Sequence, residues 1–340
     1  MKFGSVDDPG TIDFTLPPDH PDTIKTLQKN YSDKTNVFVG CAKWNRADLK
    51  GFYPRGTKDE LEYYSRQFNS IELNATFYRI FPPEQFVKWY DKTPSNFKFF
   101  PKLNQEISHW KRLNDDVGPV VDNYLYSVVN LKEKLGCLFL QMHNNFAPKD
   151  FERVIKFIEG WPKEIPLAVE FRHTGWYNDT AVAEDLYQLL EENNISNIIV
   201  DSAGRRDIMH MRLTNSRAFV RYVGANHDSD YTRLDDWVGR LKLWKEAGLE
   251  HINFFVHQNI EKESPLLSAY FIKQLNVELG MDLKIPKEED SFVGNQTSFE
   301  DQLLIQEPIS KSKISQEEID KLADESKKSW WMKNKNRFIK

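Results

Sequence analysis

The sequence predicts an α/β fold in which strands and helices alternate along one large domain. We expect eight strands, at 37–43, 70–74, 97–102, 136–141, 166–172, 195–201, 218–223 and 251–257. Helical patterns separate most of them, at 59–68, 84–90, 119–135, 149–158, 180–193 and 234–247, and a last one follows at 265–279. Strands separated by helices imply right-handed βαβ units and a parallel sheet. Eight such units in about 245 residues are typical of a TIM (β/α)8-type barrel.

An open, doubly wound sheet is the rival architecture. It favours a glycine-rich phosphate loop after an early strand, and the sequence contains neither G-x-G-x-x-G nor G-x-x-x-x-G-K-[ST]. The segment 202–217, between the sixth and seventh expected strands, is too short and polar for a full helix.

The two ends of the chain differ from this alternating region. Residues 1–36 carry turn residues and no sustained periodicity, so we expect an irregular N-terminal lead. The barrel domain then spans 37–280. Residues 281–340 are rich in Lys, Glu, Ser and Gln and form a charged tail that is partly helical, with a capping-box pattern at Ser315-x-x-Glu318.

Composition limits the class of protein. The chain has 340 residues, of which 40% are hydrophobic, so it can bury a core. It has no apolar run near the 20 residues of a membrane span and no secretory signal, so we expect a cytoplasmic protein without membrane contact. Cys41 and Cys137 are too few for a disulfide framework. The oligomeric state is not set by the sequence.

A polar residue lies at or within two positions of the end of every expected strand. In a barrel these ends meet in one ring, where catalytic groups lie. The candidates are Lys43, Asn74, Lys102, Gln141, Arg172, Asp201, Arg221 and His257. The alternative is that any strand leaves the core through polar residues.

Glu72 and Glu170 are a candidate carboxylate pair for acid–base catalysis. Their neighbours Ile71, Leu73 and Val169 are apolar and belong against helices, so period-two alternation turns both glutamates to the lumen. The structural alternative is an ion pair that stabilises the barrel mouth, with Arg172 as the partner of Glu170.

Lys102 completes the predicted catalytic set. A desolvated lysine can form a Schiff base, whereas a charged one can hold a phosphate or carboxylate or make an ordinary salt bridge. Four cations at strand ends face three anions, so the mouth is net positive and is expected to attract a small anionic or phosphorylated molecule. The cations are Lys43, Lys102, Arg172 and Arg221, and the anions are Glu72, Glu170 and Asp201.

Loop residues complete the candidate binding set. Tyr78, His109 and His173 follow expected strands two, three and five, and aromatic rings there either stack on a substrate or cover the barrel. His109, His143, His173 and His257 could hold a metal with the carboxylates, but no known metal spacing is present. Neither a metal nor another cofactor is assigned.

Several motifs resemble one known family. V-G-C-A-K-W-N (39–45), E-x-N-x-T-F-Y (72–78), E-F-R-H-x-x-W (170–176) and F-V-R-Y-V-G (219–224) occur in order. The series is similar to the YecE-like family, domain-of-unknown-function family 72, over residues 37 to about 280. The resemblance implies a TIM barrel and no established activity. The chain departs from the family pattern at 141–145 and 255–259.

Three functions remain open at this stage. The first is an enzyme of hydrolase or lyase type acting on a small anionic substrate. The second is a nucleic-acid-processing, phosphodiesterase-like protein aided by the basic end of the tail, where residues 311–340 hold nine Lys or Arg. The third is a barrel that binds a ligand without catalysis.

Overall fold

Nine parallel-paired strands form the centre of the computed structural model, which describes residues 4–29 and 31–287. The strands are β1 (Asn36–Cys41), β2 (Ser70–Leu73), β3 (Lys98–Pro101), β4 (Leu138–Gln141), β5 (Leu167–Glu170), β6 (Ser196–Asn197), β7 (Ile199–Ser202), β8 (Arg217–Gly224) and β9 (His251–Gln258). They lie where eight strands were expected, because β6 and β7, separated by Ile198 alone, together occupy the place of the sixth expected strand. The expected helix at 315–328 and the basic end lie outside the described residues.

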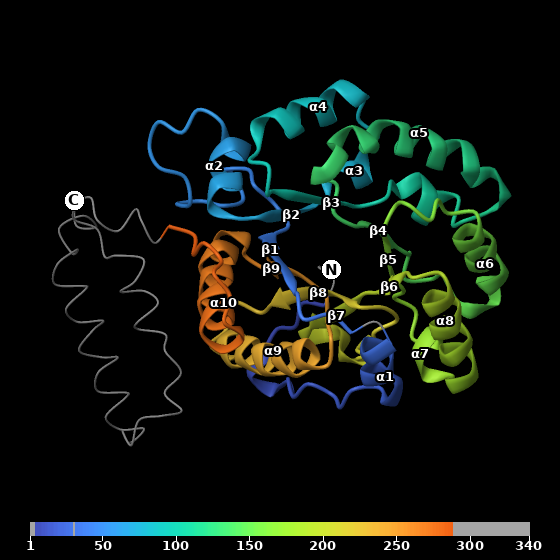
Figure 1. The fold of residues 1–340 in the computed structure, drawn as a ribbon. Coiled ribbons are helices and arrows are strands. Elements are labelled where there is room, and N and C mark those ends of the chain that lie inside the picture. Colours follow the sequence, from blue (N-terminus) through green and yellow to red (C-terminus); the bar gives the residue numbers. More distant parts are fainter. Residues whose placement is uncertain (1–3, 30, 288–340) are drawn as a thin grey trace, which may run out of the picture. The chain divides into compact units, whose positions relative to one another are not determined.

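Ten α-helices surround these strands in the described part of the chain (Figure 1). They are α1 (Pro21–Lys29), α2 (Glu60–Gln67), α3 (Ala75–Tyr78), α4 (Pro83–Lys92), α5 (Gly118–Val128), α6 (Phe151–Glu159), α7 (Gly175–Asn178), α8 (Thr180–Glu192), α9 (Ser229–Glu246) and α10 (Ser264–Leu279). Local sequence sets their ends. The side chain of Asp179 caps α8 by accepting from the amides of Ala181 and Val182, and Gly280 ends α10 with a φ of 65°.

The strand ladders form three parallel sheets, in the orders β1-β9-β8-β7, β2-β3 and β4-β5-β6. Isolated bridges link Phe99 to Leu135 and Lys102 to Phe139, next to β3 and β4. Between β1 and β2, the Asn69 side chain bonds both the amide of Val39 and the carbonyl of Val37. The fold is therefore mixed α/β with parallel sheets, and its ladders do not close into one continuous barrel.

Two apolar clusters lie on the two faces of the strands. Ile71, Leu73 and Val169 belong to the large cluster that packs strands against helices. Phe100, Phe139 and Phe219 belong to a smaller cluster on the opposite strand face. Period-two alternation produces this division, and it turns Glu72 and Glu170 away from the helices.

The sequence predicted an irregular N-terminal lead, but part of the lead is helical. It contains the short 3-10 helix η1 (Pro9–Thr11) and helix α1, and Leu27 of α1 is fully buried. The turn residues around its start, including Pro17, Pro18 and Pro21, indicated a loop, so the sequence pattern did not predict α1.

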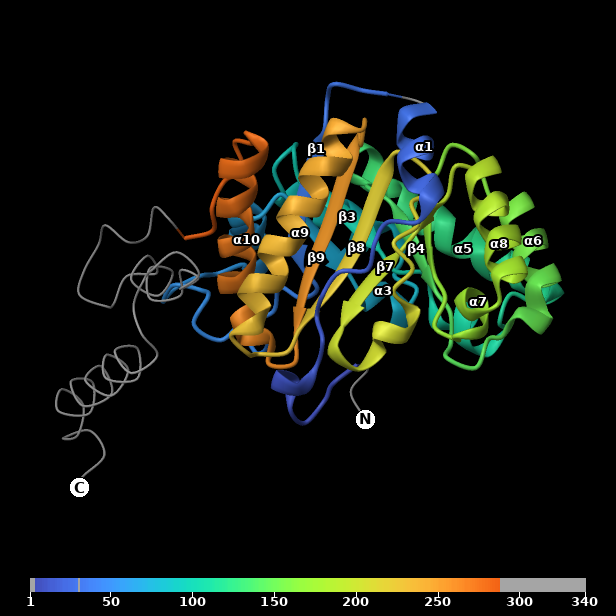
Figure 2. The same ribbon diagram turned by 90° about the horizontal axis from the view of Figure 1, so that it is seen from below.

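Helix α1 occupies the place of a missing helix. Only the 3-10 turn η6 (Ala203–Ile208) lies between β7 and β8, as the short polar segment predicted, and α1 lies between α8 and α9 (Figure 1). Thr23 of α1 donates to the carbonyl of Met211, and Arg212 donates to Thr26. The lead runs from the carboxyl ends of the strands, where the carbonyl of Gly4 accepts from Ser202, to α1 near their amino ends (Figure 2).

Candidate functional site

Arg221 joins the two predicted catalytic carboxylates. From β8, its Nε and Nη2 donate to Glu72 of β2 at 2.9 and 2.8 Å, and its Nη1 donates to Glu170 of β5 at 2.6 Å. Both glutamates are 0% exposed. The three residues therefore form one buried ion network that spans the strands.

A second chain of contacts extends from Glu170. Arg172 donates to Glu170 Oε1 at 2.5 Å, and Gln141 at the end of β4 donates to both carboxylate oxygens at 3.0 and 3.1 Å. Gln141 Oε1 in turn accepts from Lys102 Nζ at 2.7 Å. The Lys102 ammonium position lies 4.0 Å from the centre of the Phe77 ring.

His257 and Asn74 complete the surroundings of Glu72. His257 Nε2 lies 3.1 Å from Glu72 Oε2 and 3.4 Å from Arg221 Nη2. Asn74 donates to Glu72 Oε1 at 2.9 Å. Each oxygen of Glu72 thus contacts two polar side chains.

The network fixes the charge of its carboxylates. Burial raises the pKa of Glu170, but the charges of Arg172 and Arg221 outweigh burial and lower that pKa to about 2. Burial also raises the pKa of Glu72, but the charges of Arg221 and His257 outweigh it and lower that pKa well below the usual range. Both carboxylates are ionised near neutral pH, so neither can serve there as a general acid.

For Lys102, in contrast, burial and the neighbouring arginines together favour the uncharged form. Burial lowers its pKa, and the charges of Arg221 and Arg172 add to that effect, so the pKa is about 7. Glu170 and Glu72 raise the pKa by less. The amine therefore spends a large part of its time uncharged at neutral pH.

A cavity of about 530 Å³ opens beside this network at the carboxyl ends of β1, β5, β8 and β9. We call it the carboxyl-end pocket. Its lining includes five basic side chains and two acidic ones, together with His257. The basic residues are Lys43, Lys50, Arg172, Arg221 and Lys262, and the acidic ones are Asp48 and Glu261.

Not every predicted residue lies in this assembly. Asp201 turns to the opposite face of β7, where it accepts from Arg206, Arg233 and the indole of Trp237 at 2.5, 2.8 and 2.8 Å. The prediction that Asp201 faces the lumen is wrong, because Val200, not Asp201, has the inward position on this strand.

The predicted loop residues have mainly local contacts. His173 accepts from the amide of Gly175 at 3.0 Å, and Tyr78 is 72% exposed. Lys43 lines the pocket and pairs with Asp48 at 3.1 Å. His109 lies edge-on to the rings of Phe77 and His143, and burial, followed by the charge of Lys102, lowers the pKa of His109 to about 4.

Sequence reasoning missed Asp48 and Gln258 in the pocket lining. Asp48 follows Asn45 by three residues and accepts from its side chain at 2.7 Å, a local turn that the spacing could have indicated. Gln258 follows His257 directly, and its side chain donates to Asp230 at 3.1 Å. No sequence signal pointed to that contact.

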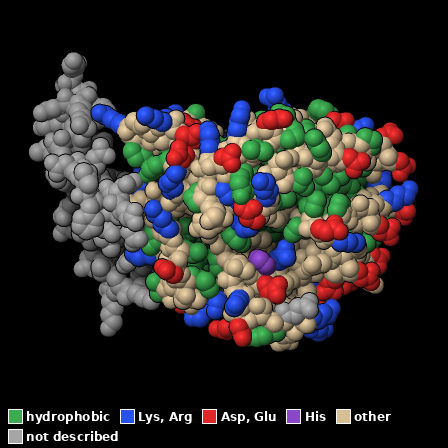
Figure 3. Space-filling view, turned by 45° about the horizontal axis from the view of Figure 1, so that its top comes forward, with side chains coloured by type: hydrophobic (Ala, Val, Ile, Leu, Met, Phe, Trp, Pro, Cys, Tyr) green, Lys and Arg blue, Asp and Glu red, His purple; other side chains and the backbone are tan. Residues whose placement is uncertain are grey.

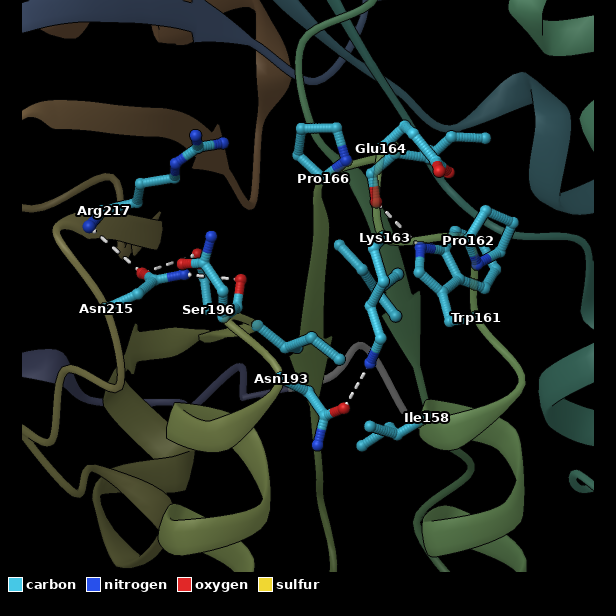
Figure 4. A pocket seen from close by; sticks show the side chains of 14 residues that line it. Ile158, Trp161, Pro162, Lys163, Glu164, Pro166, Asn193, Ser196, Asn215 and Arg217 are labelled. Atoms are coloured by element: carbon cyan, nitrogen blue, oxygen red, sulfur yellow. Dashed lines mark hydrogen bonds between the residues drawn. The ribbon is translucent and has the colours of Figure 1, made fainter.

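A smaller cavity, of about 160 Å³, lies at the other end of the strands (Figure 4). It is lined by the first residues of β5, β6 and β8 and by the segments that precede these strands, including Pro166, Ser196 and Arg217. Lys163 bonds Asn193 at 2.5 Å there, and Ser196 bonds Asn215 at 3.1 Å. None of the predicted site residues lines it.

The histidines proposed as metal ligands do not gather into a ligand set in the described residues. The one group found there with suitable spacing is His20, Asp22 and Glu184, on the lead and α8. His20 Nε2 lies 3.1 Å from Glu184, and the amide of Asp22 donates to His20 Nδ1.

No helix in the described residues is long and apolar enough to cross a membrane.

Parallel strands, surrounding helices and a charged pocket at the carboxyl ends define an α/β protein with a candidate ligand site. Family models match residues 38–290 to the family described as "Protein of unknown function DUF72", so the chain belongs to the DUF72 family. This confirms the resemblance drawn from the motifs.

Relatives and solved structures agree with this membership. The chain is 24% identical over 283 residues to the UPF0759 protein YecE of Escherichia coli strain K12, covering 75% of this chain and all of YecE. The UPF0759 protein YunF of Bacillus subtilis strain 168 is 26% identical over 201 residues, covering 56% of this chain and 71% of YunF.

Two crystal structures of DUF72 family proteins share the fold. The one from Thermotoga maritima MSB8 has a TM-score of 0.58 and 25% identity, covering 71% of this chain and 99% of that one. The one from Enterococcus faecalis V583 has a TM-score of 0.60 and 19% identity, and the match covers 74% of this chain and 100% of that one.

Proposed function

We propose that the protein is an enzyme of hydrolase or lyase type that acts on a small anionic or phosphorylated molecule in the carboxyl-end pocket. The observation that carries this proposal is the excess of basic side chains around a cavity of about 530 Å³, with Arg172 and Arg221 in its lining. Cavities of about 300–1,000 Å³ suit small-molecule ligands. Partly desolvated cations attract an anion more strongly than exposed ones do.

His257 is the group in this pocket best suited to move a proton. It lines the cavity, and its Nε2 lies against the ionised Glu72. A carboxylate on one ring nitrogen orients an imidazole and leaves the other nitrogen for a substrate. Glu72 and Glu170 then act as positioning residues, because both are held in ion pairs with Arg221.

We also propose that the strands form a TIM barrel. Support comes from the parallel pairing of the strands and from the inward apolar cluster, to which β3, β4, β5, β8 and β9 contribute. The interruptions between the three sheets are also local. In this proposal the barrel domain includes the lead, because α1 packs in the place of a barrel helix.

The face shown in Figure 3 gives no special support to a nucleic-acid function. Acidic and basic side chains are interspersed over the face shown in Figure 3, and no long basic stripe of described residues crosses it. Strong non-specific nucleic-acid binding requires clustered Lys and Arg. The basic end of the tail lies outside the described residues.

Retained small molecules test the proposal. The full-length protein is purified at low salt and denatured, and the released compounds are identified by mass spectrometry and then assayed as substrates. We expect an anionic metabolite that is retained by the wild type and by Arg66→Gln, a control at an exposed ion pair on α2, but lost from Arg172→Gln. Equal retention by Arg172→Gln, or binding without turnover, would argue against the enzyme.

A further inference from the structure

Lys102 is a buried amine that has no carboxylate partner among the described residues. It is 7% exposed, and no acidic oxygen of the described residues lies within 4.0 Å of its Nζ. Its one hydrogen-bond acceptor there is the neutral Gln141 Oε1, at 2.7 Å. A lysine ammonium carries three donor hydrogens, so hydrogen bonding satisfies the charged form poorly, and the Phe77 ring at 4.0 Å is its other favourable contact.

Lys134 provides an internal comparison. It is 5% exposed, yet its Nζ donates to the carbonyls of Tyr90 and Thr93 at 2.6 Å each and approaches Thr93 Oγ1 at 3.3 Å. Lys134 therefore has three acceptors for three hydrogens. Lys102 thus differs from Lys134 in coordination, although the two side chains have similar exposed fractions.

The charged groups around Lys102 come from several elements. Arg221 of β8 and Arg172 after β5 repel a proton on the amine, whereas Glu170 of β5 and Glu72 of β2 attract one. His109 faces it from η2 (Glu106–Trp110) and is mainly neutral at pH 7. Together with burial, these groups keep much of the amine unprotonated at neutral pH, with its lone pair available.

We propose that Lys102 is a catalytic nucleophile that forms a Schiff base with a carbonyl group of the substrate. This inference rests on the proposed function, because the anionic group of the substrate would be held by Arg172 and Arg221 in the carboxyl-end pocket. Lys102 is joined to these arginines through Gln141 and Glu170, and in the proposal the carbonyl end of the substrate extends from the pocket to its Nζ. It narrows the substrate class to small aldehydes or ketones that carry a phosphate or carboxylate.

The chemistry balances without a cofactor. The lone pair of the neutral Nζ attacks the carbonyl carbon, a C–N bond forms, and the carbonyl π electrons move to oxygen, which takes a proton. Loss of water from this carbinolamine leaves a C=N bond, and protonation gives an iminium ion. The iminium withdraws electrons from the neighbouring carbon–carbon or carbon–hydrogen bond, which is the step that a lyase requires.

Reductive trapping tests the proposal. The full-length protein is incubated at pH 7 with pyruvate or with dihydroxyacetone phosphate, in the presence of sodium cyanoborohydride, and is then digested and mapped by mass spectrometry. Hydride addition to the C=N bond leaves a secondary amine, so a labelled lysine gains the mass of the carbonyl compound less one oxygen atom. We expect Lys102 to be labelled at least tenfold more than Lys134 with one of the probes, and inorganic phosphate to reduce that labelling.

Variants separate this inference from the proposed function. Lys102→Arg should lose the label, and Arg66→Gln should keep it. If Lys102→Arg does not fold, the labelling map of the wild type decides alone. Labelling confined to exposed lysines, with both probes, overturns the Schiff-base role. If phosphate still binds and Arg172→Gln weakens it, the proposed anion site survives that result; if phosphate does not bind, both proposals fail.

Discussion

Arg221 donates to both carboxylate oxygens of Glu72, at 2.9 and 2.8 Å, although 149 positions separate the two residues. The same guanidinium reaches Glu170 with its remaining terminal nitrogen. Arg221 thus pairs with two fully buried carboxylates. Its removal would leave Glu170 with Arg172 and Glu72 with His257.

Arg221→Met should destabilise the protein strongly. Breaking a buried ion pair by removing one partner costs about 3–5 kcal/mol, because the other charge stays buried. Unfolding in urea measures the effect. Arg66→Met, which removes an exposed partner of Glu62, should change the free energy of unfolding by about 0.5 kcal/mol or less. A loss below about 1 kcal/mol for Arg221→Met would contradict the network.

Acid should weaken the fold through Glu170 and Glu72. Their folded pKa values are depressed, so the stabilisation they provide is complete above the ordinary pKa of 4.5 and is lost as the pH falls toward about 2 for Glu170. Glu170→Gln should be less stable at pH 7 and should lose less stability between pH 4.5 and 2. Urea unfolding of both proteins at several pH values measures this, and parallel curves would refute it.

Asp201→Asn should affect stability and not ligand binding. Asp201 is buried among Arg206, Arg233 and Trp237, on the strand face away from the pocket. Weakening these charged bonds should lower the free energy of unfolding by about 1–3 kcal/mol. Phosphate affinity, measured by calorimetry, should match that of the wild type. A tenfold loss of affinity would return Asp201 to the site.

The lead should be necessary for full stability. Leu27→Ala removes a fully buried side chain of α1 and should cost about 2–5 kcal/mol. Deletion of residues 1–35 should cost more, because it uncovers the space between α8 and α9. Thermal unfolding provides the measurement. A deletion variant with an unchanged midpoint would show that α1 is dispensable.

Most strands and the central charged cluster were predictable from local pattern. Alternating apolar and polar residues in I-E-L-N and A-V-E-F-R turned Glu72, Glu170 and Arg172 to one side, as the structure shows. Asp201 was misplaced because its position at a strand end was used as the guide. Period-two alternation puts it on the same face as Ile199, which packs against the helices, and puts Val200 on the inward face. The placement of α1 depends on contacts such as Thr23 with Met211, across 188 positions, which no local pattern encodes.

Binding of inorganic phosphate tests the central claim most directly, since the claim is that Arg172 and Arg221 hold an anion in the carboxyl-end pocket. Isothermal titration calorimetry at low ionic strength would compare the wild type, Arg172→Gln and the control Arg66→Gln. The account predicts that Arg172→Gln binds phosphate at least tenfold more weakly, about 1.4 kcal/mol, and that Arg66→Gln matches the wild type. Absence of phosphate binding by the wild type, or equal affinity in all three proteins, would contradict it.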